Sequence, residues 1–103
     1  MRKAKDSPNA CQLRMLTLIE ALSGSEVFGM RLRDVAKAVG VIDSTALRDL
    51  ETLSAAGWAQ KLPDNRWRLS AKPIQLLFNF QSGLARAEEQ VDEVRRNYTR
   101  KPI

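Results

Sequence analysis

Two short helices separated by a glycine are predicted by the spacing of apolar positions near the middle of the chain. The apolar face of the first helix consists of Leu32, Val35, Ala36 and Val39. Gly40 is expected to end this helix in the left-handed conformation, and residues 41–42 then form a turn that packs inward. Asp43 and Ser44 offer capping oxygens to a second helix that runs from about residue 44 to residue 56. The pattern predicts a helix-turn-helix.

The second predicted helix has an apolar inner face and a mostly polar outer face. Its inner residues are Ala46, Leu50 and Leu53, and its outer residues are Ser44, Thr45, Leu47, Arg48 and Glu51. The first four outer residues lie in the opening turns, where a recognition helix meets base edges and phosphates. Small hydroxyls allow close approach to phosphate, and an arginine can donate two hydrogen bonds to guanine. The alternative is a plain helical hairpin with a solvated outer face.

Two runs with the alternation of β-strands follow, residues 58–62 and 66–70, on either side of the turn-forming segment 63–65. The side chains predicted to face the core are Trp58, Leu62, Trp67 and Leu69. Lys61, Arg66 and Arg68 fall on the other side or at the tip. A basic hairpin beside a recognition helix acts as a wing that contacts the phosphate backbone or enters the minor groove. The alternative is that these cations only solvate an ordinary hairpin.

From about residue 15 to residue 69 the chain resembles the N-terminal winged helix-turn-helix domain of the IclR-type bacterial transcription regulators. That domain has a leading helix, the pattern L-x-x-[VIL]-A, a glycine, the pattern S-T-x-x-R-x-L-x-x-L, a second glycine and a hairpin. The matching residues are Leu32, Val35, Ala36, Gly40, Ser44, Thr45, Arg48, Leu50, Leu53 and Gly57, followed by Trp67, Arg68 and Leu69. The resemblance implies that Ser44, Thr45 and Arg48 face DNA.

The chain departs from the family pattern at three places. Arg33, which we count among the DNA-contacting residues, stands where the family often has a Ser or Thr helix cap. Asp49 replaces a usually apolar residue. Only 34 residues follow position 69, so we expect no small-molecule effector domain of the kind those regulators carry.

The charge of the chain favours a polyanionic partner. Its 103 residues carry a formal net charge of +5, with an isoelectric point near 9.9. Asp43, Asp49 and Glu51 lie near the predicted recognition surface and would repel phosphate if they faced a duplex. We expect Asp43 to cap the second helix and the other two to sit on its flanks. The alternative function is a winged-helix adaptor for another protein, without DNA binding, in which Asp49 and Glu51 form the docking face.

Enzyme chemistry finds little support in the residue types present. The chain has no histidine, the commonest general base and metal ligand, and Cys11 is its only cysteine. Its five glycines form no phosphate-binding loop. The carboxylate pair Glu88–Glu89 lies in a highly charged helical segment, which suits solvation better than acid–base work. We therefore expect no enzyme activity, no catalytic residue, no metal and no cofactor.

The start of the chain predicts a flexible basic arm and then a helix. Residues 1–7 are polar and basic without the apolar run of a signal peptide, and no segment is apolar enough to span a membrane. We expect a cytoplasmic protein. Ser7 is the expected cap of the first helix and Pro8 its first residue. The predicted core stripe of this helix is Met15, Leu16, Ile19 and Leu22.

A third apolar pattern, near the C-terminus, has the alternating spacing of three and four that coiled coils use. Its members are Leu77, Phe80, Leu84, Ala87, Val91, Val94 and Tyr98. We predict a C-terminal helix over residues 71–98, with an ion pair between Asp92 and Arg96 and a tail at 99–103. We expect the turn from Ile74 to Phe80 to dock on the core of the first domain and the rest of the helix to pair with a second copy. The alternative is that the helix folds back, so that Leu77, Phe78 and Phe80 cover the first helix of its own domain.

The sequence thus predicts a mainly α fold with a small β-hairpin, a winged helix-turn-helix over residues 8–70 that is followed by a C-terminal dimerisation helix. The predicted function is sequence-specific binding of double-stranded DNA by a homodimer, as a small transcription regulator of a bacterium or mobile element that acts by operator occupancy. Thr45, Leu47 and Arg48 are expected to face bases and Ser44 to face phosphate.

Overall fold

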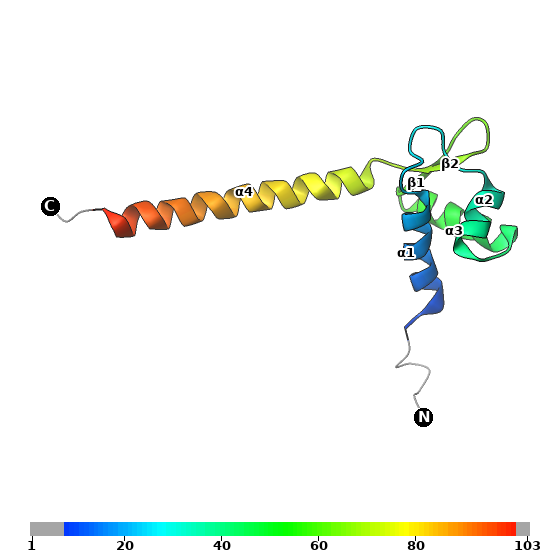
Figure 1. Ribbon diagram of the computed structural model, residues 1–103, viewed down its shortest axis with the longest axis horizontal. Coiled ribbons are helices and arrows are strands. Elements are labelled where there is room, and N and C mark those ends of the chain that lie inside the picture. The colour runs from blue at the N-terminus through cyan, green and yellow to red at the C-terminus, as the bar shows by residue number, and fades with distance from the viewer. Residues whose placement is uncertain (1–7, 101–103) are drawn as a thin grey trace, which may run out of the picture. The chain divides into compact units, whose positions relative to one another are not determined.

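A computed structural model describes residues 8–100 (Figure 1). Its elements are α1 (Ala10–Leu22), α2 (Leu32–Val39), α3 (Asp43–Ala55), β1 (Ala59–Lys61), β2 (Trp67–Leu69) and α4 (Lys72–Thr99). The chain divides into two units, the first ending at Lys72 and the second beginning at Pro73, close to the boundary predicted after residue 70. The expectation of a mainly helical chain with one hairpin and a long C-terminal helix is confirmed.

Helix α1 begins two residues later than the sequence suggested. Asn9 is its N-cap, and the Asn9 side chain accepts a hydrogen bond from the backbone N–H of Gln12 at 3.1 Å. Pro8 precedes the helix, so its prediction as the first helical residue was wrong. Asparagine is among the best N-cap residues, and its local hydrogen bond fixes the start. The predicted cap Ser7 and the predicted arm lie outside the described residues.

The core of the first unit lies between the three helices and the hairpin. Leu18 and Leu22 of α1 pack in a buried cluster with Val35, Leu50, Leu53, Ala59, Trp67 and Leu69. Leu16 was predicted in this core but is 58% exposed. The α1 face that meets the core carries Met15, Leu18, Ile19 and Leu22, the spacing of one helical stripe. Leu16 lies off that stripe, and the prediction placed it where Leu18 belongs.

The turn between α2 and α3 follows the glycine prediction but not the capping prediction. Gly40 has φ +84, and its N–H donates to the Ala36 carbonyl at 2.8 Å. Helix α3 begins at Asp43, and its N-cap Ile42 makes no side-chain capping bond. The capping roles predicted for Asp43 and Ser44 were therefore wrong. Ile42, expected to pack inward, is also exposed. Asp43 instead places a negative charge in the first turn, where the helix dipole favours it.

The hairpin pairs β1 and β2 antiparallel, with Ala59 opposite Leu69 and Lys61 opposite Trp67. Its loop closes through the Leu62 N–H, which donates to the Arg66 carbonyl at 2.7 Å. Ala59, Trp67 and Leu69 are the buried side chains. Trp58 and Leu62 were predicted to face the core, and both are half-buried. Trp58 packs against the core cluster from its position just before β1.

A segment between α1 and α2 is joined to the hairpin by backbone hydrogen bonds. The Met30 N–H donates to the Trp67 carbonyl at 2.7 Å, and the Trp67 N–H donates to the Met30 carbonyl at 2.8 Å. Gly29 precedes this bridge with φ +76, and a Cβ there would lie 2.9 Å from Leu62 Cδ1. The close approach of this backbone to the hairpin therefore needs glycine at position 29.

Helix α4 spans 28 residues, none of them buried. The seven residues predicted as a coiled-coil seam lie on it, and we call them the α4 stripe: Leu77, Phe80, Leu84, Ala87, Val91, Val94 and Tyr98. Arg95 pairs with Asp92 at 3.8 Å, three residues away, in place of the predicted Asp92–Arg96 pair. Of the helices described for residues 8–100, none combines the length and apolar character needed to cross a membrane.

Candidate nucleic-acid interface

The outer face of α3 carries part of the predicted DNA-contacting set. Ser44 and Arg48 are exposed there, and Thr45 is half-buried. Leu47 was also predicted to face bases, but it is half-buried and packs against the core cluster. Successive helical residues turn by about 100°, so Leu47 lies on the flank next to buried Ala46. The exposed surface of the first turns is therefore formed by hydroxyls, one guanidinium and the Asp43 carboxylate.

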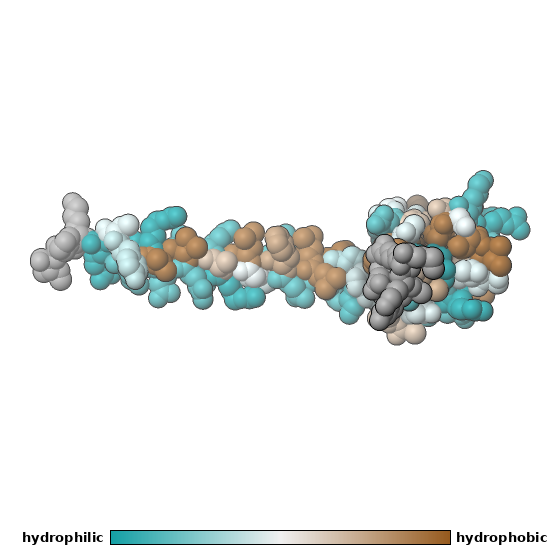
Figure 2. All heavy atoms as spheres, turned by 90° about the horizontal axis from the view of Figure 1, so that it is seen from below, coloured by the Kyte–Doolittle hydropathy of each residue, from teal (hydrophilic) through white to brown (hydrophobic). Residues whose placement is uncertain are grey.

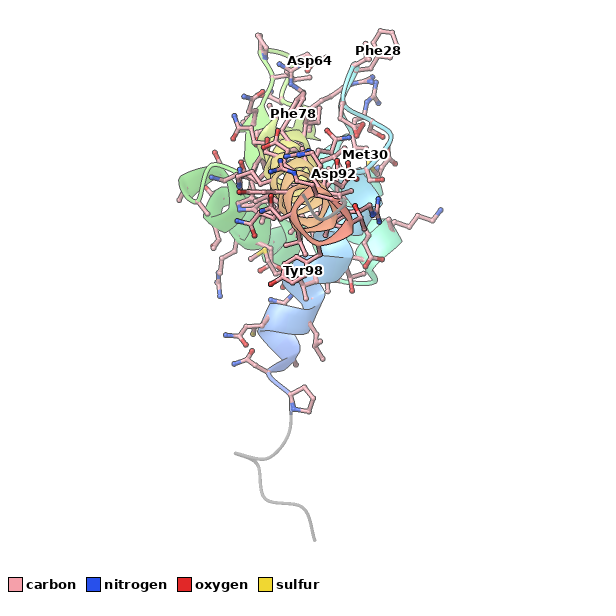
Figure 3. All side chains as sticks on the ribbon, turned by 90° about the vertical axis from the view of Figure 1, so that its left-hand side faces the viewer. Phe28, Met30, Asp64, Phe78, Asp92 and Tyr98 are labelled. Carbon is pink, nitrogen blue, oxygen red and sulfur yellow. The ribbon has the colours of Figure 1, made fainter. Side chains whose placement is uncertain are left out.

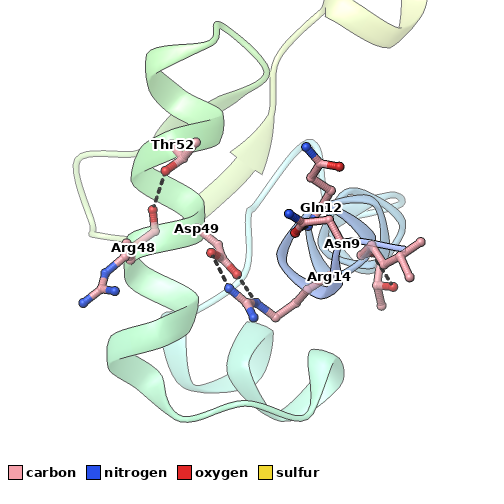
Figure 4. A network of polar contacts seen from close by, with 8 residues as sticks. Asn9, Gln12, Arg14, Arg48, Asp49 and Thr52 are labelled. Atoms are coloured by element: carbon pink, nitrogen blue, oxygen red, sulfur yellow. Dashed lines mark hydrogen bonds and ion pairs between the residues drawn. The ribbon is translucent and has the colours of Figure 1, made fainter. Parts of the chain in front are cut away.

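The backbone of Arg48 is fixed by α3, whereas its guanidinium bonds to no other side chain among the described residues. Its carbonyl accepts a hydrogen bond from the Thr52 hydroxyl at 3.0 Å (Figure 4). Within residues 8–100 its guanidinium has no hydrogen-bond or ion-pair partner. Figure 4 shows the side chain pointing away from α1. The group is thus available to an external acceptor.

Asp49, one residue further, points the other way, into the contact between α3 and α1. Its carboxylate accepts two hydrogen bonds from Arg14, from Nε at 2.6 Å and from Nη2 at 3.1 Å (Figure 4). Asp49 is only 5% exposed. Its hydrogen bond raises the pKa of Arg14 above the ordinary value, against the lowering effect of burial. The carboxylate is neutralised inside the unit and does not face the predicted recognition surface.

Glu51 remains on the outer face of α3. It is exposed and stands three residues after Arg48, which places the two side chains on neighbouring positions of one helical face. Of the three acidic residues that the sequence placed near the recognition surface, Asp43 and Glu51 are exposed and Asp49 is not. A phosphate approaching the outer face of α3 would therefore be repelled by Asp43 in the first turn and by Glu51 beside Arg48.

Two of the three cations predicted on the hairpin, Lys61 and Arg66, are at least partly exposed to solvent. Lys61 is exposed, with its Nζ 5.7 Å from the centre of the Trp67 ring. Arg66 is half-buried, and its Nε lies 3.6 Å from Asp64 Oδ2 at the hairpin tip. Figure 3 shows Asp64 at the hairpin tip and Phe28, from the loop between α1 and α2, both projecting away from the helices. Lys61 lies on the strand face of Trp67, not on the opposite face as predicted.

Arg68 is engaged within the protein. Its Nε donates to Gln60 Oε1 at 3.0 Å, and its Nη1 donates to the Glu26 carbonyl at 3.3 Å. These bonds tie β2 to β1 and to the loop after α1. A guanidinium has five N–H donors, so Arg68 retains some for an external acceptor. Its first role in this structure is to hold the hairpin in place.

The surface of α2 adds cations that the sequence prediction omitted. Arg33, which was predicted, is exposed, and so are Arg31, the residue just before the helix, and Lys37. Arg31 makes no side-chain capping bond. Arg33 and Lys37 occupy the polar positions between the apolar residues of α2, so the pattern that predicted the apolar face also contains them. Arg31 and Lys37 were missed because the sequence prediction centred on the second helix and the hairpin and took only Arg33 from this segment.

The side chains that bind metals or act as nucleophiles were also located. Cys11 is exposed on α1 as a free thiol. No three His, Cys, Asp or Glu side chains gather as a possible metal site in the part of the chain that the structure describes.

Comparison of the chain with models of known protein families and with curated proteins finds no match. A function must therefore be argued from the residues and their geometry.

Proposed function

We propose that the first unit is a winged helix-turn-helix domain that binds double-stranded DNA in a sequence-specific manner. In this proposal α3 enters the major groove, with Arg48 and Thr45 toward base edges and Ser44 toward phosphate. Lys61 and Arg66 of the hairpin contact the backbone on one side, and Arg33 with Arg31 contacts it on the other. Leu47 is left out of the base-facing set because it packs against the core.

The observation that carries the proposal is the division of charge across α3. Arg48 stands exposed and unpaired among the described residues, while the neighbouring Asp49 is withdrawn into its ion pair with Arg14. An arginine in the opening turns of an exposed helix is the residue that reads guanine most often. Had Asp49 faced outward, its charge would have opposed that of Arg48 beside any phosphate.

The order of elements supports the same assignment. A helix, a bridging segment, two helices around a glycine turn and a basic hairpin follow each other in the first unit. That order is compatible with a winged helix. The proposed biological role is that of a small transcription regulator of a bacterium or mobile element, which acts in the cytoplasm by occupying an operator.

The proposal is tested by selecting duplexes from a random pool and measuring affinity for the enriched sequence against salt. Arg48→Ala is compared with Arg86→Ala, which lowers the net charge equally but lies on α4. Wild type and Arg86→Ala should enrich the same motif. Arg48→Ala should lose the motif and retain weak binding, because phosphate contacts survive. The logarithm of affinity should fall with that of salt by about 0.9 per phosphate neutralised.

A different result would favour the adaptor alternative. If wild type binds no duplex even at low salt, the first unit is not a DNA reader and its partner is a protein. If both arginine variants weaken binding equally, the protein senses only overall charge, and α3 is not the recognition helix. Burial of Asp49 has already removed one of the two carboxylates that the adaptor was expected to use.

A further inference from the structure

The α4 stripe leaves large apolar side chains in water along one side of the helix. Its leucines and valines are about half exposed, and Phe80 and Tyr98 are 66% and 84% exposed. Figure 2 shows brown, hydrophobic residues along the side of α4 that faces the viewer. Scattered single apolar residues are normal on a surface, but a continuous series at coiled-coil spacing is not.

A helix of this kind needs packing to be stable. Among the described residues of the second unit, 73–100, α4 is the only helix or strand, and it buries none of its residues. Gly83, near its middle, costs about 1 kcal/mol relative to alanine. Helices in water take most of their stability from burial of an apolar face. The α4 stripe is the apolar face whose burial would stabilise α4.

We propose that the α4 stripe packs against the α4 stripe of a second copy of this chain, in a two-stranded coiled coil. This proposal concerns the second unit and does not depend on DNA binding by the first. The stripe supplies seven residues from each copy at the a and d positions of the seam. A hollow lined by Ala87, Gln90, Val91, Val94 and Arg95 lies along it. Such a hollow can receive a side chain of the facing helix.

The charge on α4 favours a like partner over an acidic or basic one. Residues 72–99 hold four Lys or Arg and four Asp or Glu, so this helix is neutral although the chain carries +5. Beside the stripe, at the e and g positions from 81 to 97, only Glu88 and Arg95 are charged, and they have opposite signs. In a parallel pair in register, Glu88 would face Gly83 of the second copy and Arg95 would face Gln90. No like charges meet.

The experiment is sedimentation equilibrium of the full chain without DNA. Leu84→Glu places a charge in the α4 stripe, and Ala85→Glu places the same charge on the adjacent, outward position. Wild type and Ala85→Glu should have the mass of two copies. Leu84→Glu should dissociate, with a dissociation constant raised by about tenfold or more. Helicity by circular dichroism should fall on dilution of wild type, as α4 loses its partner.

Folding of the first unit is followed separately in the same samples. Both tryptophans, Trp58 and Trp67, lie in the first unit, so their fluorescence reports its integrity and not that of α4. The expected result is an unchanged emission spectrum in all three proteins. A monomeric wild type, a mass above two copies, or equal weakening by both variants would overturn the proposal. A pair that survives Leu84→Glu would also do so, because it must use another surface.

Discussion

Arg14 of α1 donates two hydrogen bonds to Asp49 of α3, and these join residues 35 positions apart in the sequence. The pair fastens the first helix to the helix that carries the proposed reading face. Asp49 is buried while Arg14 keeps a quarter of its side chain exposed. The carboxylate therefore depends on its partner more than the guanidinium does.

Removing one member of this pair should destabilise the first unit. Arg14→Met leaves a buried carboxylate without a partner and should lower the melting temperature by about 4 °C or more. The double variant Arg14→Met with Asp49→Leu should recover much of that loss, because no buried charge remains. Arg95→Met, which breaks the exposed pair with Asp92, is the control and should change little. Additive losses in the double variant would contradict this account.

Glu51 should oppose DNA binding where Asp49 does not. Glu51→Gln removes a negative charge from the exposed face of α3 and should raise affinity for duplex about two- to fivefold at low salt. Glu89→Gln makes the same change in net charge on α4 and serves as the control. Titration of a labelled duplex measures both. An equal gain from the two variants would mean that Glu51 lies away from the bound DNA.

Gly29 should be the glycine least tolerant of substitution. Gly29→Ala forces a side chain into positive φ, which costs about 1–2 kcal/mol, and sets a Cβ within 3.0 Å of Arg66 Cβ and of the Trp67 carbonyl. Gly24→Ala is a matched control, since its φ is also positive but its Cβ would meet nothing within 4 Å. Denaturant unfolding followed by tryptophan fluorescence should show the larger loss for Gly29→Ala. Equal losses would show that only backbone strain matters.

Substitution of Gly83 by alanine should stabilise its helix, in contrast to the destabilising substitution of Gly29. Gly83→Ala places a methyl group 3.7 Å from Arg86 Nη2, an ordinary contact. It should stabilise α4 by about 0.5–1 kcal/mol, because alanine is the better helix former. The expected signal is a higher helical content by circular dichroism at low protein concentration. A loss of helicity at that concentration would contradict the prediction, because alanine would then not stabilise the unpaired helix.

The sequence predicted most elements because their signals were local. Gly40 marked the end of α2, and the segment around Asp64 marked the hairpin, since backbone conformation there depends on a few adjacent residues. Helix starts were less predictable, because Asn9 and Ser7 are both acceptable caps by type and only the fold selects one.

Contacts between distant residues were beyond the sequence. Asp49 was expected on a flank of α3, although it stands three residues after Ala46 and four before Leu53, on the inner stripe. Its charge argued against burial, because the Arg14 side chain that pairs with it lies 35 residues away in the sequence. Leu47 was misassigned for a related reason: a flanking position faces core or solvent according to how deeply its neighbour packs. Arg68 was recognised as a cation, but its bonds to Gln60 and Glu26 required the fold.

The bridge between Met30 and Trp67 is made of main-chain atoms on both sides. Its hydrogen bonds do not depend on which side chain occupies position 30, so this attachment can persist through extensive sequence change, proline excepted. A two-stranded hairpin by itself is only marginally stable in water. Here it is also anchored by main-chain hydrogen bonds, which are kept when side chains change. Residues at the hairpin tip can therefore diverge while the support beneath them stays constant.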